Sequence, residues 1–158
     1  MTSLEHAIEL TEQIRESLAA EIVVAREERV LIRKMDVDGL NARAAIRAEF
    51  NTRTAGLMTE LGKTLGAAAI DWGLTEVTMA ALSAREPAAG RRIAAVLVEV
   101  RALAATLSQL DGLNRMLGQR ALAYVRAHLA VISPRPAAYD RRGGGATVDR
   151  TSTFVRVV

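Results

Sequence analysis

The stretch that decides the fold runs from Ile93 to Val131, IAAVLVEVRALAATLSQLDGLNRMLGQRALAYVRAHLAV. Its apolar residues recur alternately three and four positions apart over more than five heptads, the spacing of a coiled-coil seam. Such a helix is roughly 60 Å long, too long for a compact globule of this mass. We therefore expect an all-α, elongated fold, either an antiparallel helical hairpin or a three-helix coiled-coil bundle. The seam positions are Ile93, Val96, Val100, Leu103, Leu107, Leu110, Asn114, Leu117, Ala121, Tyr124, His128 and Val131.

A first amphipathic helix is expected to precede this one. The residues Thr2-Ser3-Leu4-Glu5 fit a capping box, in which a hydroxyl and a carboxylate satisfy backbone amides at a helix start. The helix should end near MDVDGLN, residues 35–41, whose acids and glycine are typical of a stop and a restart. Its apolar face is predicted to hold Leu4, Ile8, Ile14, Leu18, Ile22 and Ala25.

A second helix is expected from about Asp38. Each glycine inside a helix costs about 1 kcal/mol relative to alanine, so the glycines at 62, 66 and 73 predict a bend or an opening of this helix. A short helix from about Thr75 to Ala84 should then lead to Pro87, which suits the first turn of the long C-terminal helix. The predicted apolar face of the second helix holds Ile46, Phe50, Leu57, Leu61 and Leu65.

The C-terminal end differs in composition from the rest of the chain. The helical pattern stops at Pro134 and Pro136, and the Gly143–Gly145 run favours a flexible backbone. The sequence thus predicts a helical domain over residues 1–133 and a flexible tail over residues 134–158. Residues 1–133 carry 16 basic and 16 acidic side chains, so the net charge of +3 resides in the tail.

This composition excludes several classes of protein. A neutral helical domain with few aromatic residues lacks the basic stripe and stacking rings of a nucleic-acid binder. The N-terminus is acidic, without the apolar core of a secretory signal, and the longest run free of charged residues, Ala102–Leu110, is far short of the roughly 20 residues that span a bilayer. We therefore expect a soluble, cytoplasmic protein that does not span a membrane.

The residues that carry chemistry are sparse. Cysteine is absent, which excludes disulfides and thiolate metal sites. His6 is expected to be solvated, and His128, on the seam, to be partly buried and hydrogen-bonded. The glycine run lacks the strand before it and the lysine after it that a phosphate-binding loop needs. We expect no enzymatic activity, no cofactor and no metal.

Asn114 is a polar residue on an apolar seam, close to Gly112 and Gly118. One interpretation is structural, because a polar seam residue commonly fixes the register of a coiled coil. The other is functional: the helix is locally loosened where the helix of another protein docks. Both interpretations remain open at the level of sequence.

Two stretches carry a family resemblance. Residues 107–129, LSQLDGLNRMLGQRALAYVRAHL, and residues 136–145, PAAYDRRGGG, resemble the C-terminal half of the FlgN family of flagellar export chaperones. Asn114, Leu117 and the run Tyr139–Gly143 match the Asn-x-x-Asn-Gly-x-Leu-like and Tyr-Asp-Arg-Arg-Gly patterns of that family. Asp111 replaces the first Asn of the pattern and Arg115 stands where Gly is usual. The resemblance extends over about residues 1–145.

The resemblance implies a cytoplasmic, non-catalytic chaperone. Its clients would be the C-terminal helices of hook-associated proteins, which join the flagellar hook to the filament, and it would keep them unassembled and deliver them to the type III export gate. An apolar seam can offer its face to a partner helix in this way. The expected client-binding residues are Leu107, Leu110, Asn114, Leu117 and Tyr124.

The tail is expected to dock on the export gate. A flexible segment can be ordered on binding and released readily, with Tyr139 as an aromatic anchor and Arg141 and Arg142 steering it to an acidic surface. A chaperone of this kind should be monomeric or weakly self-associating. One alternative is a homo-oligomeric coiled-coil protein without a client, and another is nonspecific nucleic-acid binding through the tail.

Overall fold

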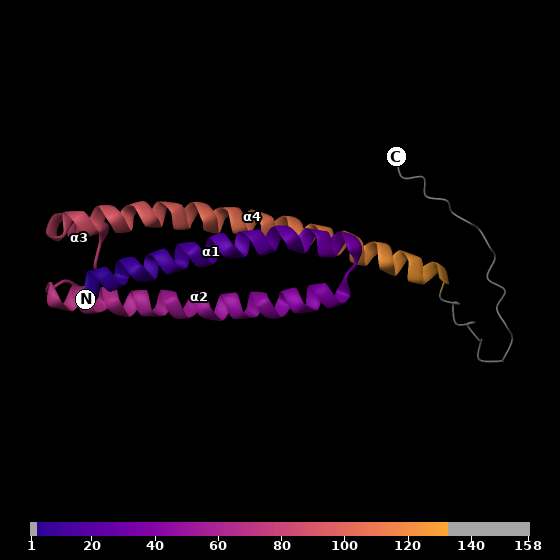
Figure 1. Ribbon diagram of the computed structural model, residues 1–158, viewed down its shortest axis with the longest axis horizontal. Coiled ribbons are helices and arrows are strands. Elements are labelled where there is room, and N and C mark those ends of the chain that lie inside the picture. The colour runs from indigo at the N-terminus through magenta and orange to yellow at the C-terminus, as the bar shows by residue number, and fades with distance from the viewer. Residues whose placement is uncertain (1–2, 133–158) are drawn as a thin grey trace, which may run out of the picture. The chain divides into compact units, whose positions relative to one another are not determined.

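The computed structural model describes residues 3–132, which form four helices and no strand (Figure 1). Of the described residues, those up to Ala123 form one compact unit and those from Tyr124 on belong to a second, so the last helix contributes residues to both. The all-α prediction is confirmed. The predicted flexible tail, residues 134–158, lies outside the described residues. The helices are α1 (Ser3–Lys34), α2 (Val37–Asp71), α3 (Met79–Arg85) and α4 (Pro87–Ile132).

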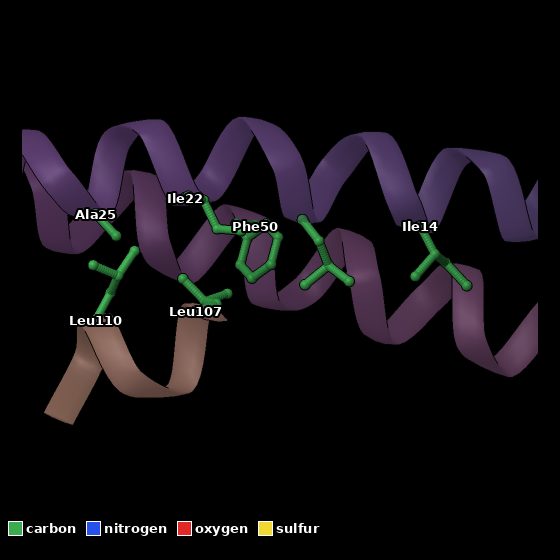
Figure 2. Packing of buried hydrophobic residues seen from close by; sticks show 7 residues of the cluster. Ile14, Ile22, Ala25, Phe50, Leu107 and Leu110 are labelled. Carbon is green, nitrogen blue, oxygen red and sulfur yellow. The ribbon is translucent and has the colours of Figure 1, made fainter. Parts of the chain in front are cut away.

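Three long helices run side by side in the first unit. Figure 1 shows α2 returning beside α1 in the opposite direction, whereas α4 runs in the same direction as α1. Of the two arrangements expected, this part of the chain adopts the three-helix bundle. Apolar side chains from all three helices form its main cluster, in which Figure 2 shows Phe50 of α2 beside Ile22 of α1 and Leu107 of α4. The buried members are Ile14, Leu18, Ile22, Ala25, Phe50, Leu107 and Leu110.

A second cluster lies where α3 meets the N-terminal parts of α1 and α4. Leu82 of α3, 1 % exposed, packs there with Ile8 of α1 and Ile93 of α4. The start of α4 must pass close to α3, since a Cβ on Gly90 would lie 3.0 Å from the Cα of Ser83. Pro87 begins α4, as the sequence predicts.

The connection between α1 and α2 is a tight turn. Met35 adopts a left-handed conformation (φ 54°), and the amides of Met35 and Asp36 donate to the carbonyls of Ile32 and Leu31. These two bonds form a Schellman motif, which closes α1. Asp36 then caps α2 by accepting a bond from the Gly39 amide, 2.9 Å long. The stop and restart predicted at residues 35–41 is thus confirmed.

The end of α2 differs from the prediction. The helix passes unbroken through Gly62 and Gly66 and ends only at Asp71, after which Gly73 adopts a left-handed conformation (φ 68°). The intrinsic penalty of two interior glycines is about 2 kcal/mol. Burial of Ala68 and Ala69 and the packing of Leu61 and Leu65 outweigh that penalty, because each large apolar side chain buried contributes about 1.5–3 kcal/mol.

Two further predictions of burial are wrong. Ile46 is 50 % exposed, because buried Arg43 and half-buried Arg47 occupy the side of this turn of α2 that faces α1. The seam of α4 is buried or half-buried only as far as Ala121, and every described side chain from 122 to 132 is exposed. Tyr124, His128 and Val131 are therefore seam residues by spacing alone.

Candidate functional site

Polar contacts hold α4 against α1. Arg92 of α4 donates to Glu12 of α1 over 2.8 Å, and Arg15 of α1 reaches Glu99 of α4 over 3.4 Å. Both pairs lie at the exposed border of the interface, where an ion pair contributes less than about 1 kcal/mol. The apolar seam beneath them therefore supplies most of the attraction, and these pairs set the alignment of the two helices.

Asn114 is buried on the seam with an exposed fraction of 4 %. Its Nδ2 donates to the backbone carbonyl of Ala25 over 2.8 Å, and its Oδ1 accepts from Nε of Arg29 over 3.1 Å. A buried amide with both ends bonded fixes the position of α4 along α1. The structural interpretation of Asn114 as a register lock agrees with these contacts, and α4 continues unbroken through Gly112 and Gly118.

A charged network joins the three long helices one turn before Asn114. Glu21 of α1 is 3 % exposed and accepts hydrogen bonds from Arg43 and Arg47 of α2. Arg47 also donates to Asp111 of α4, and Arg43 lies 3.3 Å from Glu28 of α1. A buried carboxylate is tolerated only when it is paired and hydrogen-bonded, and two guanidinium groups meet that need here.

The Arg47 guanidinium stays charged in this setting. Burial alone would lower its pKa, but the hydrogen bonds with Glu21 and Asp111 outweigh burial and raise the pKa above its ordinary value. Its cation also lies 5.4 Å from the centre of the Phe50 ring. Asp111, which departs from the family pattern, thus adds an ion pair to the apolar contacts between α4 and α2.

The sequence analysis missed Glu21, Arg43 and Arg47. The spacing contained a signal, because Glu21 follows Leu18 by three positions and precedes Ala25 by four, which puts a carboxylate on the apolar face of α1. An ionisable residue at such a position indicates a buried partner of opposite charge.

The expected client-binding residues fall into two groups. Leu107, Leu110 and Asn114 are buried, with exposed fractions of 4–8 %, and α1 covers them. Leu117 is half-buried and Tyr124 is 57 % exposed. A partner therefore reaches Leu117 and Tyr124 directly but reaches the first three only if α1 moves aside. The expected gate-docking residues Tyr139, Arg141 and Arg142 lie outside the described residues.

The C-terminal part of α4, residues 115–132, is here called the distal segment. It is rich in large apolar side chains that water reaches, a feature that spacing alone did not reveal. Contiguous exposed apolar surface is typical of sites that interact with proteins, ligands or membranes. The exposed residues are Met116 (52 %), Leu122 (49 %), Tyr124 (57 %), Val125 (37 %), Leu129 (56 %), Val131 (86 %) and Ile132 (74 %).

The two histidines differ from expectation. The His128 side chain is exposed rather than partly buried, and its ring centre lies 4.3 Å from that of Tyr124, one turn earlier on the same helix. His6 is partly buried rather than fully solvated, with its Nε2 3.0 Å from Glu60 of α2. His6 therefore helps to join α1 to α2.

No metal centre emerges from residues 3–132, where no group of three or more His, Asp or Glu side chains could hold an ion. By length and composition alone, α4 is the one described helix that could cross a membrane, and 17 % of its apolar 18-residue window is buried. A core helix of a soluble protein meets the same criteria. The finding reflects the apolar, little-covered surface of α4.

Comparison with known proteins gives one match. The family model described as FlgN protein matches residues 1–147, which is most of the chain and includes the bundle, the distal segment and Tyr139–Gly143. No match was found among curated proteins or among solved structures.

Proposed function

The chain belongs to the FlgN family of flagellar export chaperones, and on that premise we propose that it binds the C-terminal helices of hook-associated proteins. It would keep these helices unassembled in the cytoplasm, where FlgN chaperones in general act, and deliver them to the type III export gate. The observation that carries this proposal is the exposed apolar surface of the distal segment, including Leu122, Leu129 and Ile132. The protein would act by binding, without catalysis or a cofactor.

A client helix would pack on the distal segment by helix-in-groove recognition. Leu117, which is half-buried, and Tyr124, which is exposed, would contribute to this surface directly, and Leu107, Leu110 and Asn114 would join it if α1 moved aside. Tyr139, Arg141 and Arg142 remain our proposal for docking at the gate, on the strength of the family match to residues 1–147.

Light scattering tests the proposal. The protein is mixed with the C-terminal helical segment of a hook-associated protein from the same genome. We expect a discrete complex of defined mass, with the free protein monomeric. The double variant Leu122→Asp/Leu129→Asp should form no complex. The variant protein should keep the helicity of the unchanged protein, because both side chains are about half exposed and belong to neither buried cluster. Val98→Asp, at a 64 % exposed position of α4 before the distal segment, is the matched control.

Two results would count against the proposal. If the free protein is a stable oligomer and forms no complex, the distal segment serves self-assembly, as in the homo-oligomeric alternative. If Val98→Asp weakens the complex as much as Leu122→Asp/Leu129→Asp does, the client binds elsewhere.

A further inference from the structure

We infer that the partner of the distal segment is an amphipathic helix whose apolar stripe is flanked by acidic side chains. This inference rests on the proposed function and adds the chemistry by which the partner is selected. It is carried by the charge of the distal segment, by the absence of pairing for that charge within residues 3–132, and by the way α1 already packs on α4.

The distal segment carries charge of one sign. Arg115, Arg120 and Arg126 are exposed, and the sequence has no acidic residue from 112 to 139. None of these three arginines contacts a carboxylate of the described residues, in contrast to Arg92, which pairs with Glu12. The segment therefore combines an apolar surface with a positive field that the carboxylates of residues 3–132 leave unneutralised, and such a field attracts an acidic partner and speeds its association.

Helix α1 shows what kind of helix the seam of α4 accepts. Its apolar residues Leu18, Ile22 and Ala25 pack against Leu107 and Leu110. Its first four turns are flanked mainly by acids, Glu5, Glu9, Glu12 and Glu16, and Glu12 pairs with Arg92 of α4. Where α4 offers Glu99 or Asn114 instead, α1 presents Arg15 or Arg29, so the charge beside the seam of α1 complements that of α4. The same three-and-four spacing continues on α4 beyond Asn114, so a second acidic amphipathic helix meets the same kind of surface there.

Other occupants fit less well. A second copy of the distal segment would bring three more arginines and no acid, and like charges across an interface oppose association. A nucleic acid would neutralise the arginines but leave Leu122, Leu129 and Ile132 in water. An anionic membrane offers both chemistries, but Gly118, where an added Cβ would meet nothing within 4 Å, leaves room for the backbone of a partner helix to approach closely, which favours a helix.

Two synthetic helical peptides provide the test. Both carry the same stripe of leucine and alanine, and they differ only in having glutamate or lysine beside the stripe. We expect the glutamate peptide to bind the full-length protein at least tenfold more tightly at low salt. The difference should shrink at 1 M salt, where the Debye length is about 3 Å. Isothermal titration calorimetry measures both affinities.

Neutralising variants locate the charge. The variant Arg120→Gln/Arg126→Gln should bind the glutamate peptide about fivefold more weakly, at the scale of exposed ion pairs. Arg91→Gln/Arg101→Gln removes two exposed arginines of α4 that lie before the distal segment and pair with no carboxylate of residues 3–132. This variant should bind the glutamate peptide as the unchanged protein does. Circular dichroism should show equal helicity for both variants.

Four results would overturn the inference. They are equal binding of the two peptides, equal affinity of the two arginine variants for the glutamate peptide, binding of phosphatidylglycerol vesicles but of neither peptide, and a stable dimer formed through the distal segment.

Binding of the C-terminal segment of a hook-associated protein distinguishes a failure of this inference from a failure of the proposed function. If that segment binds and the peptides show no preference, the proposed function stands and the acidic partner does not; if neither that segment nor either peptide binds, both are wrong.

Discussion

The side-chain amide of Asn114 in α4 donates to the backbone carbonyl of Ala25 in α1, with 2.8 Å between Nδ2 and O. Asn114 is also the last fully buried side chain of α4 among the described residues. Toward the N-terminus the seam of α4 is covered by α1, and toward the C-terminus it becomes progressively exposed. The bond therefore marks the transition from the part of α4 that builds the bundle to the part available to a partner.

Replacing Asn114 should weaken the bundle. In Asn114→Ala, the Ala25 carbonyl and Nε of Arg29 lose their partner in a buried setting. We expect the free energy of unfolding to fall by about 1–3 kcal/mol. Urea denaturation followed by circular dichroism measures the change. Asn51→Ala, at an exposed position of α2, is the control and should stay within about 0.5 kcal/mol of the unchanged protein. Equal stabilities of the two variants would contradict the register lock.

Replacing Glu21 should be more damaging. In Glu21→Ala, Arg43, which is 5 % exposed, and Arg47 lose the carboxylate between them. Removing one partner of a buried charge pair costs about 3–5 kcal/mol when the remaining charge is left uncompensated. Because Arg43 keeps Glu28 and Arg47 keeps Asp111, we expect a loss at the lower end of that range, about 3 kcal/mol. Glu27→Ala removes an exposed glutamate two turns later on α1 and should change stability by less than about 0.5 kcal/mol. The same urea titration compares the two variants. A small effect of Glu21→Ala would mean that Glu28 and Asp111 suffice to compensate the two arginines.

The Glu21 network illustrates how far sequence reasoning reaches. Periodicity predicted the long helices, the turn at residues 35–41 and the start of α4 at Pro87, because these features depend on local spacing and capping. The position of Glu21 on the apolar face of α1 could also be found from the spacing, although the sequence analysis missed it. Spacing did not show which arginine would meet Glu21, since that depends on the alignment of α1 with α2, which local spacing leaves undetermined.

The seam of α4 shows a second limit. Leu107 and Leu129 occupy similar apolar surroundings in the sequence, yet one is 6 % and the other 56 % exposed. A heptad pattern predicts which face of a helix is apolar, but it does not predict where the helix that covers this face ends. The predicted bend of α2 at its glycines was wrong for a related reason. Helix propensity does not include the packing of Leu61 and Leu65, which stabilises the helix.

The turn between α1 and α2 offers a stabilising change. Met35 adopts a left-handed conformation that costs a residue with a Cβ about 1 kcal/mol, and its side chain is 44 % exposed, so it supplies little packing. Met35→Gly should therefore raise the free energy of unfolding by up to about 1 kcal/mol. Gly39→Ala should lower it, because the new Cβ would lie 2.7 Å from Oδ2 of Asp36. Thermal and urea denaturation test both signs, and a loss of stability in Met35→Gly would contradict the argument.

A pair of leucine truncations separates the two parts of α4. Leu107→Ala removes a side chain from the main cluster and should lower the free energy of unfolding by about 2–5 kcal/mol. Leu129→Ala truncates an exposed side chain, so stability should change by less than about 0.5 kcal/mol while affinity for the hook-associated segment falls. Urea denaturation and calorimetry on each variant give both quantities. Because the two residues lie on one helix and undergo the same chemical change, a common effect on helix propensity cancels, and the contrast reports only what covers each side chain. If Leu129→Ala destabilises the bundle as much as Leu107→Ala does, the distal segment is already packed in the free protein and is not open to a client.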